Sequence, residues 1–407
     1  MRSFSSRGGL LLLTLLQQFP ATVFLYGEPF FARERFHWST GQIGLSQALV
    51  GFSIAISSYI GGKIAHRRHS RTGVMWGILL AMAFSVLGWG FGDKQGVFVL
   101  TFVGFAFCQA LVWPGIETAL VQGQTAGQVG HTLSHYNVIW SFGSWASLLL
   151  ATPLMARLGL RLLLLLPALL YLVNYVLLRW LFPIQPLPCV PTEASLSEQA
   201  EAAQLEQEQK THSLAEKRAY RWLGWIANPF GFVALNVVIS SNPALQVRLG
   251  IPFEVASVWC SLWLLFRILS FEILRHWTGW HYRWGILVTT FFLMMVSFTA
   301  ITLAPNLPIF LVAQAVFGLC LGLLYQSSIF YSLADSEAAG EHGGLHECVI
   351  GLGTMSGNLL LYVSSVGLVR SPQFPIYCVL GLMAVGWCVL FGIGMRVRKN
   401  RIVGLLK

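Results

Sequence analysis

Apolar runs of about 20 residues, separated by short polar turns, recur along the whole chain. A run of about this length crosses the hydrocarbon core of a bilayer as a helix. Most runs end at glycine, proline or charged residues, which mark turns. The pattern therefore predicts twelve membrane-spanning helices, at residues 10–31, 42–62, 73–92, 96–120, 131–155, 159–182, 221–241, 252–274, 284–304, 308–333, 345–368 and 373–395.

The first apolar run imitates a secretory signal peptide, because Arg2 and Arg7 precede a leucine-rich stretch. The run nevertheless continues to Phe31 and contains no convincing cleavage site of small residues. A signal peptide has a shorter apolar region that ends at such a site. We therefore expect this segment to remain as the first membrane span.

The pattern also repeats, because a block at about residues 35–150 recurs faintly 213 residues downstream. The matching positions are Arg35 and Arg248, Gly127 and Gly340, and Gly130 and Gly343. Parallel duplication of this size is how many transporters build one site between two halves. The sequence thus predicts an all-α membrane protein with two pseudo-symmetric bundles of six helices, residues 1–182 and 221–407, joined by a linker at 183–220.

The linker is the one long polar segment, and it is rich in glutamate, glutamine and alanine. Ser195 with Glu198, and Ser213 with Glu216, have the spacing of a capping box, which starts a helix. We interpret the segment as a solvated and partly helical linker. A regulatory or partner-binding role is the alternative.

Composition supports a membrane protein, because only 10% of residues are charged and 55% are hydrophobic, with a mean hydropathy of +0.65. A soluble domain carries about a quarter charged residues. The seven cysteines lack metal-ligand spacing, and we interpret them as small apolar residues. The net charge of +10 arises from short loops between spans, so we predict no nucleic-acid partner.

Lysine and arginine predict the orientation in the membrane, because they concentrate in cytoplasmic loops. If both termini share one side, that side carries 18 of the 26 basic residues and the other side carries seven. Arg267 falls inside a span. We therefore predict a multi-pass protein of the cytoplasmic (inner) membrane, with both termini and the 183–220 linker in the cytoplasm.

The loop between spans two and three carries the most specific local motif. Gly62, Arg67 and Arg71 match the loop signature of the major facilitator superfamily, which the chain resembles over nearly its whole length. The resemblance implies a twelve-helix fold in which this loop latches the two halves on the cytoplasmic side. The usual acidic position is His66, so the latch is expected to be weaker or pH-dependent. Alternatively, the basic residues only set topology.

Arg267 is the outstanding polar residue within a predicted span. A charge at the bilayer centre costs about 2.5–3.5 kcal/mol on an insertion scale, so it needs a partner or a polar cavity. A guanidinium offers a planar fork that suits carboxylate or phosphate. Arg267 is therefore predicted to contact an anionic substrate or a proton-carrying carboxylate. The alternative is a structural ion pair with Glu272 or Glu117.

A few ionisable residues are candidates for coupling or gating. Glu28 is predicted near the outer face, Glu117 near the inner end of span four, and Glu347 beside His346 at the start of span eleven. A carboxylate that alternates between wet and dry surroundings can carry a proton. For Glu347 the alternative is simple stabilisation by the helix dipole.

Neutral polar residues point to a central cavity. In proteins that this chain resembles, spans one, four, seven and ten line that cavity. At intermediate depth these spans contribute Gln18, Gln109, Asn236, Gln314, Tyr325 and Gln326. Such a lining suits a polar or amphipathic small molecule. The alternative is that each amide only bonds a neighbouring helix.

These features together predict a secondary active transporter that moves a small organic solute by alternating access. The resemblance implies proton coupling, and Arg267 favours an organic anion or metabolite. A facilitator or exporter of a neutral sugar-like or amphipathic solute is the first alternative. A ligand sensor, or a membrane enzyme built on His346 and Glu347 or on His131 and His135, comes from other classes. We expect no cofactor, a monomer, and solute, protons and membrane lipids as partners.

Overall fold

The computed structural model describes residues 6–66, 70–122, 124, 126–181, 207, 212–333, 339–366 and 373–402. This part of the chain is helical and contains no strand. Twelve helical spans are long and apolar enough to cross a membrane, as the hydrophobic pattern predicted. The predicted all-α membrane fold is therefore confirmed.

The first six spans form the N-half of the molecule. Its helices are α1 (Ser6–Phe36), α2 (Thr40–His66), α3 (Ser70–Phe91), α4 (Gln95–Ala110), α5 (Trp113–Val121), α6 (Ala126–Leu158) and α7 (Leu162–Leu181). The fourth span is divided into α4 and α5, because Pro114 has no N–H to donate and fits only the first turn of a helix.

The last six spans form the C-half. Its helices are α9 (Leu214–Arg248), η1 (Phe253–Val255), α10 (Ala256–Trp259), α11 (Leu262–His276), η2 (Thr278–Trp280), α12 (Trp284–Thr302), α13 (Leu307–Leu333), α14 (Ala339–Ser365) and α15 (Phe374–Ile402). The eighth span consists of η1, α10 and α11, so the apolar run at 252–274 is interrupted rather than straight.

The helix start predicted at Ser213 is confirmed, with Ser213 as the N-cap, whereas the Glu216 side chain contacts His212 Nδ1 at 2.8 Å. The Ser213 hydroxyl accepts a hydrogen bond of 3.2 Å from the backbone N–H of Glu216, which satisfies one of the free amides at a helix start. Helix α9 consequently begins at Leu214, seven residues before the predicted span. The other predicted capping box, at Ser195 and Glu198, lies outside the described residues.

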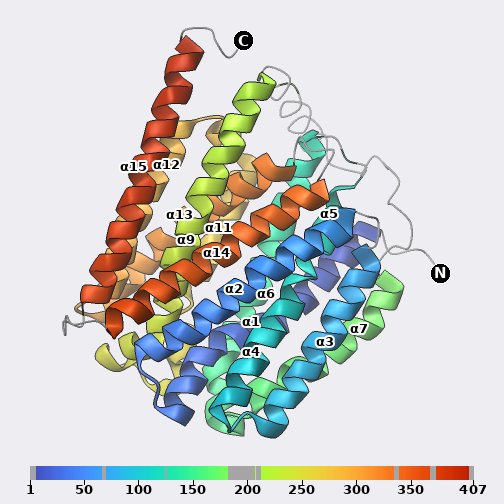
Figure 1. The fold of residues 1–407 in the computed structure, drawn as a ribbon, viewed down its shortest axis with the longest axis vertical. Coiled ribbons are helices and arrows are strands. Elements are labelled where there is room, and N and C mark those ends of the chain that lie inside the picture. The colour runs from blue at the N-terminus through green and yellow to red at the C-terminus, as the bar shows by residue number, and fades with distance from the viewer. Residues whose placement is uncertain are drawn as a thin grey trace.

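The two halves lie side by side, and α14 runs along α2 between them (Figure 1). Glycine permits this close approach, which we call the α2–α14 seam. A Cβ on Gly51 would lie 2.4 Å from the Met355 nitrogen, and a Cβ on Gly351 would lie 2.4 Å from the Ala55 nitrogen. Any larger side chain at these two positions would push the helices apart.

The spans alternate in direction, so the start of α1, the end of α7, the start of α9 and the end of α15 share one end of the bundle, here called the terminal end. The α2–α14 seam extends to both ends. Gly62 meets Gly344 near the terminal end, and Gly41 meets Ser365 near the opposite end. The halves are therefore in contact at both ends along this side.

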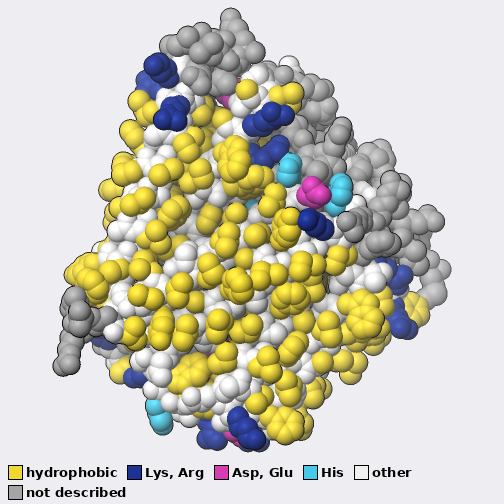
Figure 2. All heavy atoms as spheres, in the orientation of Figure 1, with side chains coloured by type: hydrophobic (Ala, Val, Ile, Leu, Met, Phe, Trp, Pro, Cys, Tyr) yellow, Lys and Arg dark blue, Asp and Glu magenta, His cyan; other side chains and the backbone are white. Residues whose placement is uncertain are grey.

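Hydrophobic side chains cover the middle of the face in Figure 2, and lysine and arginine gather toward its two ends. Large apolar side chains are exposed on many helices, including Trp76 on α3 and Val312 on α13. A soluble protein rarely leaves such a continuous apolar surface in water. This distribution is typical of a protein whose middle section is surrounded by lipid.

Candidate functional site

A cavity of ≈ 110 Å³ lies between the two halves. The N-half contributes α1, α2, α4 and α5, and the C-half contributes α9 and α14. The lining residues are Gln18, Ala21, Thr22, Leu25, Tyr26, Gln47, Val50, Ile54, Gln109, Ala110, Trp113, Phe232, Asn236, Glu347, Ile350 and Thr354. The lining thus combines amides, aromatic rings and one carboxylate, which suits a small polar molecule.

Four residues singled out from the sequence line this cavity, namely Gln18, Gln109, Asn236 and Glu347. Sequence reasoning missed the polar contributions of Gln47 on α2 and Thr354 on α14. Neutral polar residues of spans two and eleven were left out of the predicted lining, because the proteins that this chain resembles line their cavity from other spans. The available signal was a glutamine inside an otherwise apolar span.

The amides of the cavity are partly committed to neighbouring helices. Gln18 donates from Nε2 to Ser144 Oγ at 2.7 Å and to Thr22 Oγ1 at 2.9 Å. Asn236 donates from Nδ2 to the Phe232 carbonyl and to Thr354 Oγ1, both at 2.9 Å. Both residues therefore have their N–H groups occupied, and each offers its carbonyl oxygen to a solute.

Gln109 offers N–H groups to the cavity, where Gln18 and Asn236 offer carbonyl oxygens. Its Oε1 accepts from Gln17 Nε2 at 2.5 Å and from the Tyr171 hydroxyl at 2.8 Å. Asn174 in turn donates to Gln17 Oε1 at 2.7 Å. This network joins α1, α4 and α7 inside the N-half and leaves the N–H groups of Gln109 for the cavity. The amides therefore both join helices and offer groups to a ligand.

Arg267 on α11 lies among aromatic rings. Its guanidinium carbon is 4.5 Å from the ring centroid of Trp140 and 4.7 Å from that of Tyr325. The rings of Phe271 and Phe232 follow at 5.5 Å and 5.8 Å. Cation–π attraction at desolvated sites reaches about 2 kcal/mol, so the rings offset part of the cost of burying the charge.

Two nitrogens of the Arg267 guanidinium lack a hydrogen-bond partner. Nε and Nη1 are buried without a hydrogen-bond partner, and the whole residue is 1% exposed. The carboxylates suggested as structural partners are engaged elsewhere. Glu272 pairs with Arg275 at 3.1 Å and His276 at 3.3 Å. Within the described residues, Arg267 is thus held by rings and not by a carboxylate.

Arg267 does not line the cavity in this conformation, because Phe232 and Tyr325 stand beside it. The Tyr325 hydroxyl donates to Glu347 Oε1 at 3.5 Å, so this tyrosine contacts both the cation and the cavity carboxylate. The arrangement connects Arg267 to the edge of the cavity through a single side chain.

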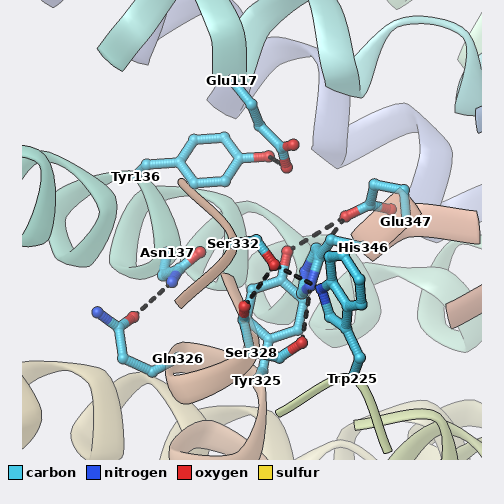
Figure 3. A network of polar contacts seen from close by, with 10 residues as sticks. All are labelled: Glu117, Tyr136, Asn137, Trp225, Tyr325, Gln326, Ser328, Ser332, His346 and Glu347. Atoms are coloured by element: carbon cyan, nitrogen blue, oxygen red, sulfur yellow. Dashed lines mark hydrogen bonds and ion pairs between the residues drawn. The ribbon is translucent and has the colours of Figure 1, made fainter. Parts of the chain in front are cut away.

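Two buried carboxylates from opposite halves lie near one another (Figure 3). Glu117 on α5 accepts from the Tyr136 hydroxyl at 3.0 Å, and its Oε2 has no hydrogen-bond partner. A Cβ on Gly343 of α14 would lie 3.3 Å from that oxygen, so Glu117 packs against the helix that carries Glu347. The two acids therefore lie at the interface between the two halves.

His346 neighbours this pair and is fully buried. Its Nδ1 lies 3.0 Å from Ser328 Oγ, and its Nε2 is 3.8 Å from Glu347 Oε1. Its ring centroid is 5.1 Å from that of Tyr325. His346 is therefore close enough to Glu347 to exchange a proton with it. His346 itself does not line the cavity.

Gln326 and Gln314 lie away from the cavity. Gln326 accepts from Asn137 Nδ2 at 2.6 Å and donates to Ser134 Oγ at 3.0 Å, both on α6 of the other half. Gln314 donates to the Trp259 carbonyl at 2.9 Å within the C-half. These two glutamines match the alternative that was left open, in which a membrane amide bonds a neighbouring helix.

Glu28 is buried between α1 and α2. Gln47 donates to its Oε2 at 2.9 Å, and its Oε1 has no partner. Because Gln47 also lines the cavity, the Gln47 side chain lies between Glu28 and the cavity. The expected outer-gate residue is thus attached to the cavity wall of the N-half.

The loop motif has one contact within the N-half. Arg71 donates to the Arg179 carbonyl at 3.2 Å, which caps the end of α7. Gly62 lies in the α2–α14 seam, where Gly344 requires a residue without a side chain. Arg67 lies outside the described residues. The motif therefore combines a helix cap with one close approach between the halves.

No group of three or more histidine, cysteine, aspartate or glutamate residues that could hold a metal occurs in the described part of the chain. His131 and His135 have ring centroids 4.5 Å apart, and His135 contacts Arg275 of the C-half. This pair therefore belongs to a contact between the halves.

Comparisons with known proteins agree with this architecture. The family model of the Major Facilitator Superfamily matches residues 10–360. A search of curated proteins by sequence found no match. The fold is similar to that of the nucleoside transporter NupG, with a TM-score of 0.67 and 11% identity over 96% of this chain and 99% of that one.

The fold is also similar to that of the human organic anion transporter MFSD10 (TETRAN). The TM-score is 0.65, with 12% identity over 96% of this chain and 100% of that one. At this level of identity both comparisons bear on the fold, and the chemistry of the site rests on its own residues.

Proposed function

We propose, from the premise that the chain belongs to the major facilitator superfamily and is a membrane transporter of a small solute, that it works by secondary active transport. The N-half and the C-half would move relative to each other and open the central cavity first at one end and then at the other. The observation that carries this proposal is the cavity itself, which both halves line.

The terminal end would face the cytoplasm, because basic residues concentrate in cytoplasmic loops. The cytoplasmic (inner) membrane is the membrane that we propose for it. The protein would act as a monomer in contact with membrane lipids. Each half contributes its own wall to the cavity, so one chain supplies a whole site.

The driving ion in this proposal is the proton, and Glu347 is the residue that carries it. Glu347 lines the cavity, and Glu117 lies near it on the opposite half. Two carboxyl groups at a shared buried interface resist being ionised together, because like charges repel there. One proton held between them would therefore support closure, and its release would favour reopening.

The proposed solute is a small organic anion or metabolite. The supporting observation is Arg267, which is buried with Nε and Nη1 unpaired. A planar fork with free edges suits a carboxylate or a phosphate. The organic anion transporter MFSD10 has the same fold, although the argument for an anion rests on Arg267.

A neutral polar solute is the second candidate, and the amide lining favours it. The cavity offers the carbonyl oxygens of Gln18 and Asn236 and the N–H groups of Gln109, with Tyr26 and Trp113 as flat walls. These groups could bind a hydroxyl-rich or heteroaromatic molecule without any charge. The nucleoside transporter NupG shares this fold.

Thermal unfolding of the purified protein separates the two candidates. Organic anions, sugars, amines and lipids would be added at acid and neutral pH. A ligand at 100 times its dissociation constant should add about 2.7 kcal/mol of stability. We expect anions to stabilise the native protein. Their affinity for the Arg267→Gln variant should be lower by at least about tenfold, because one charge-assisted hydrogen bond is removed.

The matched control is Arg283→Gln, which removes an exposed arginine at the start of α12 and should bind anions like the native protein. Stabilisation by neutral ligands alone would demote Arg267 to a structural residue and make the amide-lined cavity the site. The stabilising ligand would then be tested for flux into liposomes under an imposed pH gradient. Binding without flux would contradict transport and favour a sensor.

A further inference from the structure

Three arginines gather at the terminal end of the N-half, and each comes from a different helix. Arg7 lies in the first turn of α1, Arg71 in the first turn of α3 and Arg179 in the last turn of α7. Helix α7 packs against both α1 and α3, so it joins the three positions. Figure 1 shows α3 and α7 side by side at the edge of the molecule, away from the C-half. We call these residues the arginine cluster.

The arginines of α3 and α7 are in direct contact. Arg71 donates from Nη2 to the Arg179 carbonyl at 3.2 Å. The guanidinium carbon of Arg179 lies 5.5 Å from the ring centroid of Tyr175, within the range of a cation–π interaction. Two like charges are therefore held at one helix end, although they repel each other.

The arginine of α1 lies near the same level. Asn174 of α7 donates to Gln17 of α1, and a Cβ on Gly27 would touch the Leu163 side chain. These two contacts fix an antiparallel register between the helices. Continued toward the start of α1, this register places Arg7 about 7–8 Å beyond the arginine of α7 along the helix axis, at the usual helical rise.

The positive charge of this cluster is not neutralised by the described part of the chain. Nε and Nη2 of Arg7 and Nε of Arg71 are buried without a hydrogen-bond partner. Helices α3 and α7 contain no aspartate or glutamate. The two carboxylates of α1, Glu28 and Glu34, lie toward its opposite end. A charged donor that is buried without an acceptor is costly, so the cluster favours an anion from outside the chain.

The surface beside the cluster is hollowed and largely apolar. Tyr175, Val176, Arg179 and Trp180 line a groove of ≈ 520 Å³ on α7. Trp180 is 78% exposed, and Leu172, one helical turn before Val176, is 50% exposed. Tyrosine and tryptophan are enriched where a membrane meets water, because their rings contact acyl chains and their polar atoms contact head groups. The groove therefore continues from a cationic end onto an apolar helix face.

We propose that the groove on α7 and the arginine cluster bind one anionic phospholipid from the surrounding leaflet. Arg179 is the exposed member of the cluster and contacts the phosphate, because a guanidinium binds phosphate through a planar fork. The charges of Arg7 and Arg71 attract the same group. The acyl chains lie along Val176 and Leu172. The inference does not depend on the proposed transport function, since lipid binding is measured without a solute.

Native mass spectrometry of the detergent-purified protein tests this site. The probes are phosphatidylglycerol and phosphatidylcholine with the same acyl chains, so that they differ in the net charge of the head group. We expect one molecule of phosphatidylglycerol to bind at least about tenfold more tightly than phosphatidylcholine. Arg179→Gln should weaken the binding of phosphatidylglycerol about fivefold, which is the usual contribution of one arginine to an anionic lipid surface. The binding of phosphatidylcholine should stay unchanged.

Arg398→Gln is the matched control, because it removes an exposed arginine of α15 at the same end of the bundle but on the other half. It should bind phosphatidylglycerol like the native protein. Arg179→Gln keeps the backbone carbonyl that Arg71 binds, so its thermal unfolding without lipid should match that of the native protein. Arg7→Gln is a second variant on another helix, and it should weaken phosphatidylglycerol binding in the same direction.

Equal losses in Arg179→Gln and Arg398→Gln would overturn the proposal, because any basic residue at this end would then attract the lipid. Equal binding of the two lipids by the native protein would also overturn it. Glycerol 1-phosphate, a soluble phosphate without acyl chains, should not displace the lipid even in large excess. Displacement would mean that the site takes a free phosphate and not a membrane lipid.

Discussion

At the residue scale, Arg267 stands out as a buried guanidinium without a carboxylate partner among the described residues. Arg267 is 1% exposed and stacked on rings from both halves, since Trp140 belongs to α6 and Tyr325 to α13. Its Nε and Nη1 have no hydrogen-bond partner. A residue that is costly to bury and incompletely paired is more easily explained by binding than by stability.

The residue scale also yields a prediction for coupling. Glu347→Gln keeps the size of the cavity side chain but cannot bind and release a proton. We expect accumulation driven by a pH gradient to fall at least about tenfold, because the coupling step is lost. Exchange of solute between the two sides should stay within about twofold. Both are measured in liposomes with labelled solute, once the stabilising ligand is known.

Glu341→Gln is the control for that prediction, because it removes an exposed carboxylate from the first turn of the same helix. It should accumulate solute like the native protein. Unchanged gradient-driven accumulation in Glu347→Gln would show that this carboxylate does not carry the proton. Glu117 would then be the remaining acid at the interface to examine.

At the scale of elements, the α2–α14 seam determines how the halves meet. Glycines let the two backbones touch, so contact is gained over the length of both helices without a polar bond. Helix α6 on the other side holds the halves through a few directed bonds. A close glycine contact on one side and directed hydrogen bonds on the other therefore hold the two halves together in different ways.

The seam makes a prediction about stability. Gly351→Ala would place a Cβ 2.4 Å from the Ala55 nitrogen, a backbone atom that cannot rotate away. We expect the free energy of unfolding to fall by about 1–3 kcal/mol, as for other overpacked sites. Thermal unfolding in detergent measures the change as a lower melting temperature.

Gly381→Ala on α15 is the matched control, because nothing lies within 4 Å of a Cβ there. Alanine has the higher helix propensity, so this variant should be unchanged or stabilised by up to about 1 kcal/mol. A destabilisation equal to that of Gly351→Ala would mean that any substitution in a glycine-rich helix is harmful and that the seam is not special.

At the scale of the whole molecule, the halves touch at both ends around a cavity of ≈ 110 Å³. The twelve alternating spans bring the α1 start, the α15 end and both sides of the linker to one end. Orientation in the membrane is then one binary choice for the entire chain.

The distribution of basic residues predicts that choice. A reporter that works only in the cytoplasm should be active when fused after Lys407, because the basic loops and the tail stay on the cytoplasmic side. The same reporter inserted at Asn306, an exposed residue in the turn between α12 and α13, should be inactive. The reverse pattern would mean that the topology is inverted.

Several features were predictable because they depend on local patterns. The twelve spans follow from apolar runs, and the start of α9 follows from the capping box at Ser213. Gln18, Gln109 and Asn236 were placed in the cavity region by depth and resemblance, and Glu347 was predicted only as a coupling or gating candidate; all four line the cavity. A period of hydrophobic residues and a cap are properties of neighbouring residues, so no tertiary information is needed.

The sequence by itself determined the class of the protein, the number of spans and the presence of a buried arginine. Hydrophobicity and charge are properties of short stretches of sequence, so they can be identified without the tertiary structure. Only the tertiary structure decided that Arg267 stacks on Trp140 and that Gln326 bonds α6. Gln47 reached the cavity by the same kind of packing. These contacts depend on how distant helices rotate and approach, which glycines such as Gly51 and Gly351 permit but a one-dimensional pattern does not specify.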